Sequence, residues 1–130
     1  MKILVGFDGS NSGKEALAIA KKHAISFNGN VSVVMSMVKG TENEQKEIDQ
    51  ATKDLEYAKE FFDKDNIQCE THLLIRGLSA GEDLVEFANE NNIEEIVVGV
   101  KRRSKVGKLL MGSTAQYVIL KASCPVVSVK

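Results

Sequence analysis

The sequence has few cysteines, only one proline and no long apolar run. Cys69 and Cys124 lie far apart and lack the spacing of a metal site, so we expect two inert, buried thiols. No apolar stretch approaches the length of a membrane span, and the chain enters an expected strand at Lys2, which leaves no room for a signal peptide. We therefore expect a cytoplasmic protein in a reducing environment, without a membrane partner.

An excess of charge of either sign is also absent. The chain has 17 Lys and Arg against 18 Asp and Glu, a net charge of −1 at pH 7, which argues against nucleic acid as a partner for the molecule as a whole. The cations gather locally instead. Five of them fall within eight residues: Lys101, Arg102, Arg103, Lys105 and Lys108. A cluster of this kind indicates a local site for an anion.

The pattern of apolar residues alternates between strand and helix along all 130 residues, and this length predicts one domain over 1–130. We expect strands over 2–7, 31–38, 67–75, 93–99 and 126–129, and helices over 12–27, 44–64, 79–91 and 112–122. Strict alternation with short connections predicts an α/β fold, a doubly wound, Rossmann-like sheet of five parallel strands. The third expected strand, over 67–75, carries polar residues on one face and is therefore expected near a sheet edge.

Several helix ends have recognisable signals. Two capping boxes are expected, Ser12 with Glu15 and Ser79 with Glu82. Gly29 is expected to end the first helix in the left-handed conformation. The apolar stripes place Phe27 and Ile119 on the inner faces of their helices.

The strongest signal for a ligand follows the fourth strand. This strand stops at Gly99, the basic loop comes next, and a helix begins at Gly112, Ser113 and Thr114. The N–H groups at a helix start are unsatisfied and the helix dipole favours negative charge there, so a phosphate would fit. The alternative is a solvated loop before an ordinary capped helix. Established phosphate motifs are absent: there is no G-x-G-x-x-G, and Glu15 stands where a P-loop needs Ser or Thr.

Ligands of doubly wound sheets bind at the carboxyl ends of the strands, where the end of the first strand carries Asp8. Its carboxylate could accept from a ribose hydroxyl or an adenine amine, or hold Mg²⁺ through water. The alternative is an Asx-turn, and both roles are compatible. No arrangement of nucleophile and base is recognisable, and His23 and His72 are expected to be surface or packing residues.

Three segments together resemble the universal stress protein family: Ile3 to Ser10, the spacing from Gly99 to Gly112-Ser113, and Cys124 to Val129. The resemblance covers the whole chain. The nucleotide-binding branch of that family carries Gly-x₂-Gly-x₉-Gly followed by Ser or Thr. Gly99, Gly112 and Ser113 match this pattern, whereas Arg102 stands at the second glycine. An arginine there could obstruct the phosphates or clamp them, and the neighbouring cations favour the clamp.

The resemblance implies an adenine nucleotide alpha hydrolase-like fold with bound ATP, ADP or AMP; Mg²⁺ through water at Asp8 follows from the chemistry of that carboxylate alone. It implies adenine near Gly6, Ser36 and Val98 and the ribose near Asp8. The binding residues expected from the residues and the resemblance together are Gly6, Phe7, Asp8, Gly9, Ser36, Met37, Val98, Gly99, Val100, Lys101, Arg102, Arg103, Gly112, Ser113 and Thr114. It also implies a homodimer through the last strand, Val126 to Val129.

Three functions remain open from the sequence. The first is a homodimeric stress-response protein whose recognition of a protein partner changes with bound nucleotide. The second is a slow ATPase or self-phosphorylating protein with Ser113 or Thr114 as the acceptor. The third is a member that does not bind ATP, in which Arg102 and the basic loop serve another anion.

Overall fold

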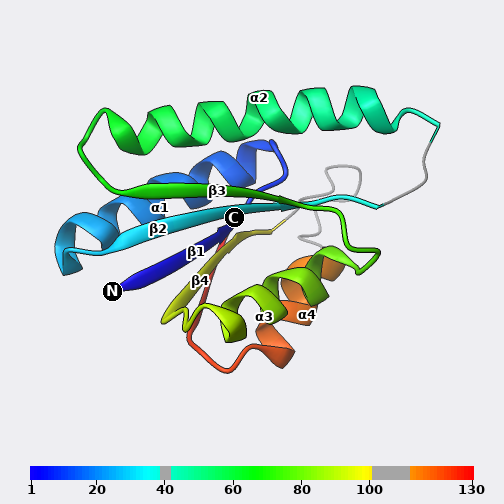
Figure 1. Ribbon diagram of the computed structural model, residues 1–130. Coiled ribbons are helices and arrows are strands. Elements are labelled where there is room, and N and C mark those ends of the chain that lie inside the picture. The colour runs from blue at the N-terminus through cyan, green and yellow to red at the C-terminus, as the bar shows by residue number, and fades with distance from the viewer. Residues whose placement is uncertain (39–41, 101–111) are drawn as a thin grey trace.

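The computed structural model describes residues 1–38, 42–100 and 112–130 (Figure 1). Strands and helices alternate along the described chain as the sequence predicts. The elements are β1 (Lys2–Gly6), α1 (Asn11–Phe27), β2 (Asn30–Ser36), α2 (Glu44–Asp63), β3 (Cys69–Leu74), α3 (Ala80–Glu90), β4 (Glu95–Gly99), α4 (Ser113–Lys121) and β5 (Val126–Val129).

The five strands form one parallel sheet in the order β3-β2-β1-β4-β5. The predicted doubly wound sheet is therefore confirmed, and β3 lies at an edge as expected. The direction of winding reverses at β1, which pairs with β2 on one side and β4 on the other. Gly6 is in register with Val34 and Val98, so the carboxyl ends of β1, β2 and β4 lie together at one end of the sheet.

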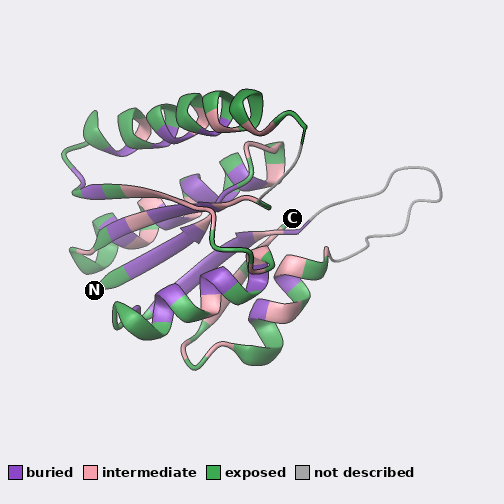
Figure 2. Ribbon diagram, turned by 45° about the vertical axis from the view of Figure 1, so that its right-hand side comes forward, coloured by how far each residue is buried: buried purple, intermediate pink, exposed green. Residues whose placement is uncertain are grey.

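Two apolar layers enclose the sheet. One layer lies under α1 and α2 and includes Ile3, Val5 and Phe62, which are fully buried. The other lies under α3 and α4 and includes Leu4 and Ile96. Alternate residues of β1 thus serve opposite faces, as a strand covered on both sides requires. Figure 2 shows the buried strands between helices whose outer faces are exposed.

The helix starts agree with the sequence at α3 but not at α1. The capping box of Ser79 and Glu82 is present in both directions and is confirmed. At α1 the predicted box of Ser12 and Glu15 is wrong, because the N-cap is Ser10, whose hydroxyl accepts from the N–H of Gly13 at 3.1 Å. Both serines suit this cap, and the N-cap lies two residues earlier than expected.

The end of α1 also differs from the prediction. Asn28, not Gly29, adopts the left-handed conformation, with φ of 50°. A short polar side chain tolerates this conformation. Gly29 is needed for another reason, since a Cβ there would meet the carbonyl oxygen of Met1 at 2.8 Å. Phe27 is exposed and packs edge-on against His23, and Ile119 is exposed as well, so their predicted inward placement is wrong.

Among the described residues, no helix combines the length and apolar character that crossing a membrane requires.

Candidate functional site

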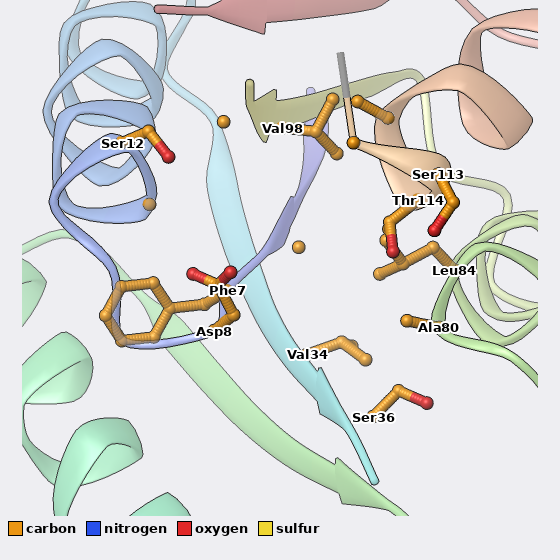
Figure 3. Close-up of a pocket in the computed structure, with 15 residues that line it drawn as sticks. Phe7, Asp8, Ser12, Val34, Ser36, Ala80, Leu84, Val98, Ser113 and Thr114 are labelled. Atoms are coloured by element: carbon orange, nitrogen blue, oxygen red, sulfur yellow. The ribbon is translucent and has the colours of Figure 1, made fainter. Parts of the chain in front are cut away.

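A cavity of about 400 Å³ opens at the carboxyl ends of β1, β2 and β4 (Figure 3). Its volume falls in the range of small-molecule pockets, and it lies at the point where the strand order reverses. Nine residues predicted for the site line it: Gly6, Phe7, Asp8, Ser36, Val98, Gly99, Gly112, Ser113 and Thr114. Segments from both ends of the chain are thus brought together, as the sheet order dictates.

Three other predicted residues do not line this cavity. Gly9 occupies the turn after β1 with φ of 80°, and a Cβ there would meet Oδ2 of Asp54 in α2 at 2.6 Å. Met37 packs against the core layer under α1 and α2. Val100 lines a neighbouring cavity that also includes Asp8. Lys101, Arg102 and Arg103, predicted to contact phosphate, lie outside the described residues.

The sequence did not indicate six further lining residues: Ser12, Gly13, Val34, Ala80, Leu84 and Ala115. Most of them come from helices, and they face the cavity because α1, α3 and α4 each begin at this edge of the sheet. The capping signals located two of these helix starts approximately. Recognising their first turns as cavity walls requires the tertiary arrangement.

The starts of α1 and α3 differ chemically from the start of α4. Serine hydroxyls at Ser10 and Ser79 accept from the first-turn N–H groups of α1 and α3. The N-cap of α4 is Gly112, which has no side chain that could accept from the N–H groups of the first turn. In Figure 3 the hydroxyls of Ser113 and Thr114 point from this turn into the cavity. The start of α4 therefore offers backbone and side-chain donors to an anion.

One part of the cavity wall is apolar. Val34, Leu84 and Val98 lie around Gly6, and all three are buried. A Cβ on Gly6 would meet the Leu84 side chain at 2.6 Å and would force it to move. Glycine thus keeps β1 in close contact with α3 at the cavity wall. An apolar surface beside a cluster of donors suits a ligand with a flat ring and an anionic group.

Asp8 lies across the cavity from Leu84 and the start of α4 (Figure 3). Its Oδ1 accepts from the N–H of Ser10 at 3.0 Å, which confirms the predicted Asx-turn. The residue remains exposed and lines the cavity, so the carboxylate can also face a ligand. A Cβ on Gly13 would meet Phe7 at 2.9 Å and Asp8 Oδ1 at 3.1 Å, so the first turn of α1 sits directly against this turn.

The two cysteines lie away from the cavity, and burial affects both thiols. Burial raises the pKa of the Cys69 thiol to about 11, and it raises the pKa of Cys124 as well. Both cysteines are free, and neither lines the cavity. Within residues 1–38, 42–100 and 112–130, no three His, Cys, Asp or Glu side chains are grouped to hold a metal ion. A lone carboxylate at Asp8 still suits Mg²⁺ that phosphates and water mainly coordinate.

Comparison with known proteins gives full-length matches. Residues 1–130 match the model of the universal stress protein family. A universal stress protein of Thermus aquaticus is 31% identical, covering 98% of this chain and 97% of its own. The structure of an Archaeoglobus fulgidus universal stress protein has a TM-score of 0.91 at 37% identity, covering 100% of this chain and 98% of its own. An Archaeoglobus fulgidus universal stress protein in complex with dAMP has a TM-score of 0.83 at 34% identity, with the same coverage.

Two other curated relatives match over shorter segments. A Mycolicibacterium smegmatis universal stress protein is 41% identical over 54 residues, which is 42% of each chain. A Methanocaldococcus jannaschii universal stress protein is 39% identical over 57 residues, 44% of this chain and 33% of its own.

Proposed function

Because the chain belongs to the universal stress protein family, we propose that it binds an adenine nucleotide in the cavity and that bound nucleotide controls its recognition of other proteins. The observation that carries the proposal is the start of α4, where glycine at the N-cap and two hydroxyls leave donors facing the cavity. The dAMP complex of the Archaeoglobus fulgidus relative supports it, since that chain is 34% identical over its whole length.

In the proposed arrangement the adenine lies against the apolar wall, near Gly6, Ser36 and Val98. The ribose hydroxyls donate to Asp8. The phosphates contact Gly99 and the start of α4. We further propose that the ligand is ATP or its di- or monophosphate, that Mg²⁺ is held through water at Asp8, and that the predicted cations Lys101, Arg102 and Arg103 add charge to the phosphate end. Contact of the nucleotide with Gly9, Met37 and Val100 stays a prediction, since none of the three lines this cavity.

Calorimetry with AMP and ATP tests the binding proposal, together with mass spectrometry of nucleotide released from denatured protein. Gly112→Val should weaken binding at least tenfold, because a branched side chain would cover the N–H groups of α4. The backbone of Gly112 has φ of −64° and ψ of 156°, which valine adopts, so the variant should still fold. Ala18→Val, an exposed change on α1, is the control and should bind normally.

Failure of both nucleotides to bind, with none released from the purified protein, would contradict the proposal and favour another anion. Labelled ATP in a single-turnover assay addresses the enzymatic alternative. Release of phosphate, or label on Ser113 or Thr114, would support a slow ATPase or self-phosphorylating protein. Unchanged ATP would support a binding module.

We also propose that the protein forms a homodimer by antiparallel pairing of β5 with its copy. This strand is at the edge of the sheet, and an unpaired apolar edge favours association.

We propose a location in the cytoplasm. The two free cysteines agree with it, since thiols stay reduced there.

A further inference from the structure

A buried carboxylate lies behind the wall of the cavity. Asp83, on the first turns of α3, is fully buried. Its Oδ1 accepts from Nε of Arg76 at 2.9 Å, and its Oδ2 accepts from the hydroxyl of Ser36. Arg76 also lies 3.9 Å from Glu90. Three elements, the end of β2, the turn after β3 and the start of α3, are thus joined by one chain of hydrogen bonds.

These bonds fix the direction in which the Ser36 hydroxyl donates. A serine hydroxyl has one proton and two lone pairs. Turning the proton toward a ligand would leave one oxygen of a buried carboxylate without its donor, which is costly. In the structure Arg76 donates to Oδ1 through Nε, and the hydroxyl that donates to Oδ2 is that of Ser36. Ser36 can therefore only accept from a molecule in the cavity.

Ser36 stands where the proposed base would lie. It lines the cavity together with Val34 and Leu84, and Figure 3 shows its hydroxyl on the side of α3, near Ala80. An adenine presents an amine at C6, which donates. Hypoxanthine and guanine present a carbonyl oxygen there, which accepts. An acceptor-only hydroxyl attracts the first group and repels the second.

We propose that Ser36, held as an obligate acceptor by Asp83 and Arg76, selects a 6-aminopurine over a 6-oxopurine. The proposal rests on the proposed function, because it assumes a nucleotide in this cavity. Ser36 would be the residue that determines specificity, and Asp83 would position its proton without touching the ligand.

The test compares dissociation constants for AMP and inosine monophosphate by calorimetry. The wild-type protein should prefer AMP by about tenfold, which is the usual effect of one hydrogen bond to the ligand. Ser36→Ala removes the acceptor and should bring the ratio close to one. Ser123→Ala, which removes a hydroxyl bonded to Asn89 away from the cavity, is the matched control and should keep the wild-type ratio.

Asp83→Asn tests the positioning role and has a distinctive outcome. The amide oxygen must face Arg76, so the amide NH₂ faces Ser36 and donates to it. The serine proton is then free to point into the cavity, and the protein should prefer inosine monophosphate to AMP. Asp63→Asn, on the exposed face of α2, is the matched control and should leave the preference unchanged.

The outcomes separate the two proposals. A wild-type protein that binds neither nucleotide overturns both. A protein that binds AMP but keeps the same ratio in Ser36→Ala overturns the specificity proposal alone. If Asp83→Asn lowers both affinities equally or fails to fold, its carboxylate is structural, and the ratio in Ser36→Ala then decides whether the serine selects the base.

Discussion

Gly99, the last residue of β4, shows how one position serves both packing and the cavity. A Cβ there would lie 2.7 Å from the carbonyl carbon of Ser12 and 2.8 Å from its oxygen. These are backbone atoms of the first turn of α1, which cannot rotate away as a side chain would. The glycine therefore lets α1 approach β4 closely, besides any room that it leaves for a phosphate.

We expect Gly99→Ala to destabilise the protein by about 1–3 kcal/mol, the usual cost of overpacking a well-packed contact. Urea denaturation measures this cost as the change in the free energy of unfolding. Ser26→Ala, at an exposed position of α1, is the control and should leave the stability close to that of the wild type. An unchanged stability in Gly99→Ala would show that α1 shifts freely.

At the scale of the element, α3 supports the apolar wall of the cavity. Its first turn carries Ala80, and Leu84 follows one turn later. The capping box at Ser79 fixes where that turn begins. A frayed start of α3 would loosen both the apolar wall and Asp83.

Ser79→Ala should reduce stability by about 1 kcal/mol, because it removes the hydroxyl that accepts from the first turn. Thermal or urea unfolding measures the loss. Ser79→Asn keeps an acceptor at the N-cap and should stay close to the wild type. Equal losses in the two variants would mean that the serine matters for a reason other than capping.

The same variant should alter the dependence of stability on pH. Hydrogen bonds from the Ser79 side chain and backbone lower the pKa of Glu82 below its ordinary value of 4.5. A lowered folded-state pKa stabilises the fold above the unfolded value, and this stabilisation is lost as pH falls through the folded value. The stability difference between wild type and Ser79→Ala should thus shrink as the pH falls below 4.5 and through the folded-state pKa of Glu82.

The elements follow from local pattern, and so the sequence alone predicts their order. Two of the errors lie where local signals are equivalent. Ser10 and Ser12 both suit an N-cap, and Asn28 and Gly29 both suit a left-handed residue. The close approach of β4 to Ser12, and of Met1 to Gly29, exists only in the folded chain and leaves no local signal.

The site was predictable where it follows directly from strand ends. Asp8 and Ser36 each lie at or just beyond the end of a strand, and parallel pairing places those ends together. Leu84 and Asp83 were not predicted as parts of the site, since a helical stripe says nothing about the cavity it faces. The role of the buried Asp83 carboxylate can be inferred only once its hydrogen-bond partners Ser36 and Arg76 are located.

On the scale of the whole molecule, β5 is an edge strand, with β4 as its neighbour on one side and no strand of the described chain on the other. The carbonyls of Pro125 and Val129 accept from β4 and from the residue that follows it. Bonded residues alternate along a parallel ladder, so the N–H groups of Val126 and Ser128 point toward the open edge. These are the groups that an antiparallel partner strand would use.

Ser128→Pro should convert the proposed dimer to a monomer, because it removes an outward N–H while preserving the bonds to β4. Light scattering after gel filtration measures the mass. Ser128→Thr keeps the N–H and should remain dimeric. A dimeric proline variant would place the interface elsewhere, and a monomeric wild type would refute dimerisation.

The strand order also has a consequence for synthesis of the chain. β1 is synthesised before the other described strands yet lies in the middle of the sheet, and its second neighbour, β4, does not begin until Glu95. One edge of β1 therefore stays unpaired until β4 has been made. The cavity lies at the ends of β1 and β4, the strands that pair late, and its wall is complete only after the start of α4 has been made. A ligand can thus bind the cavity only after the start of α4 has been made, and it cannot guide the earlier steps of folding.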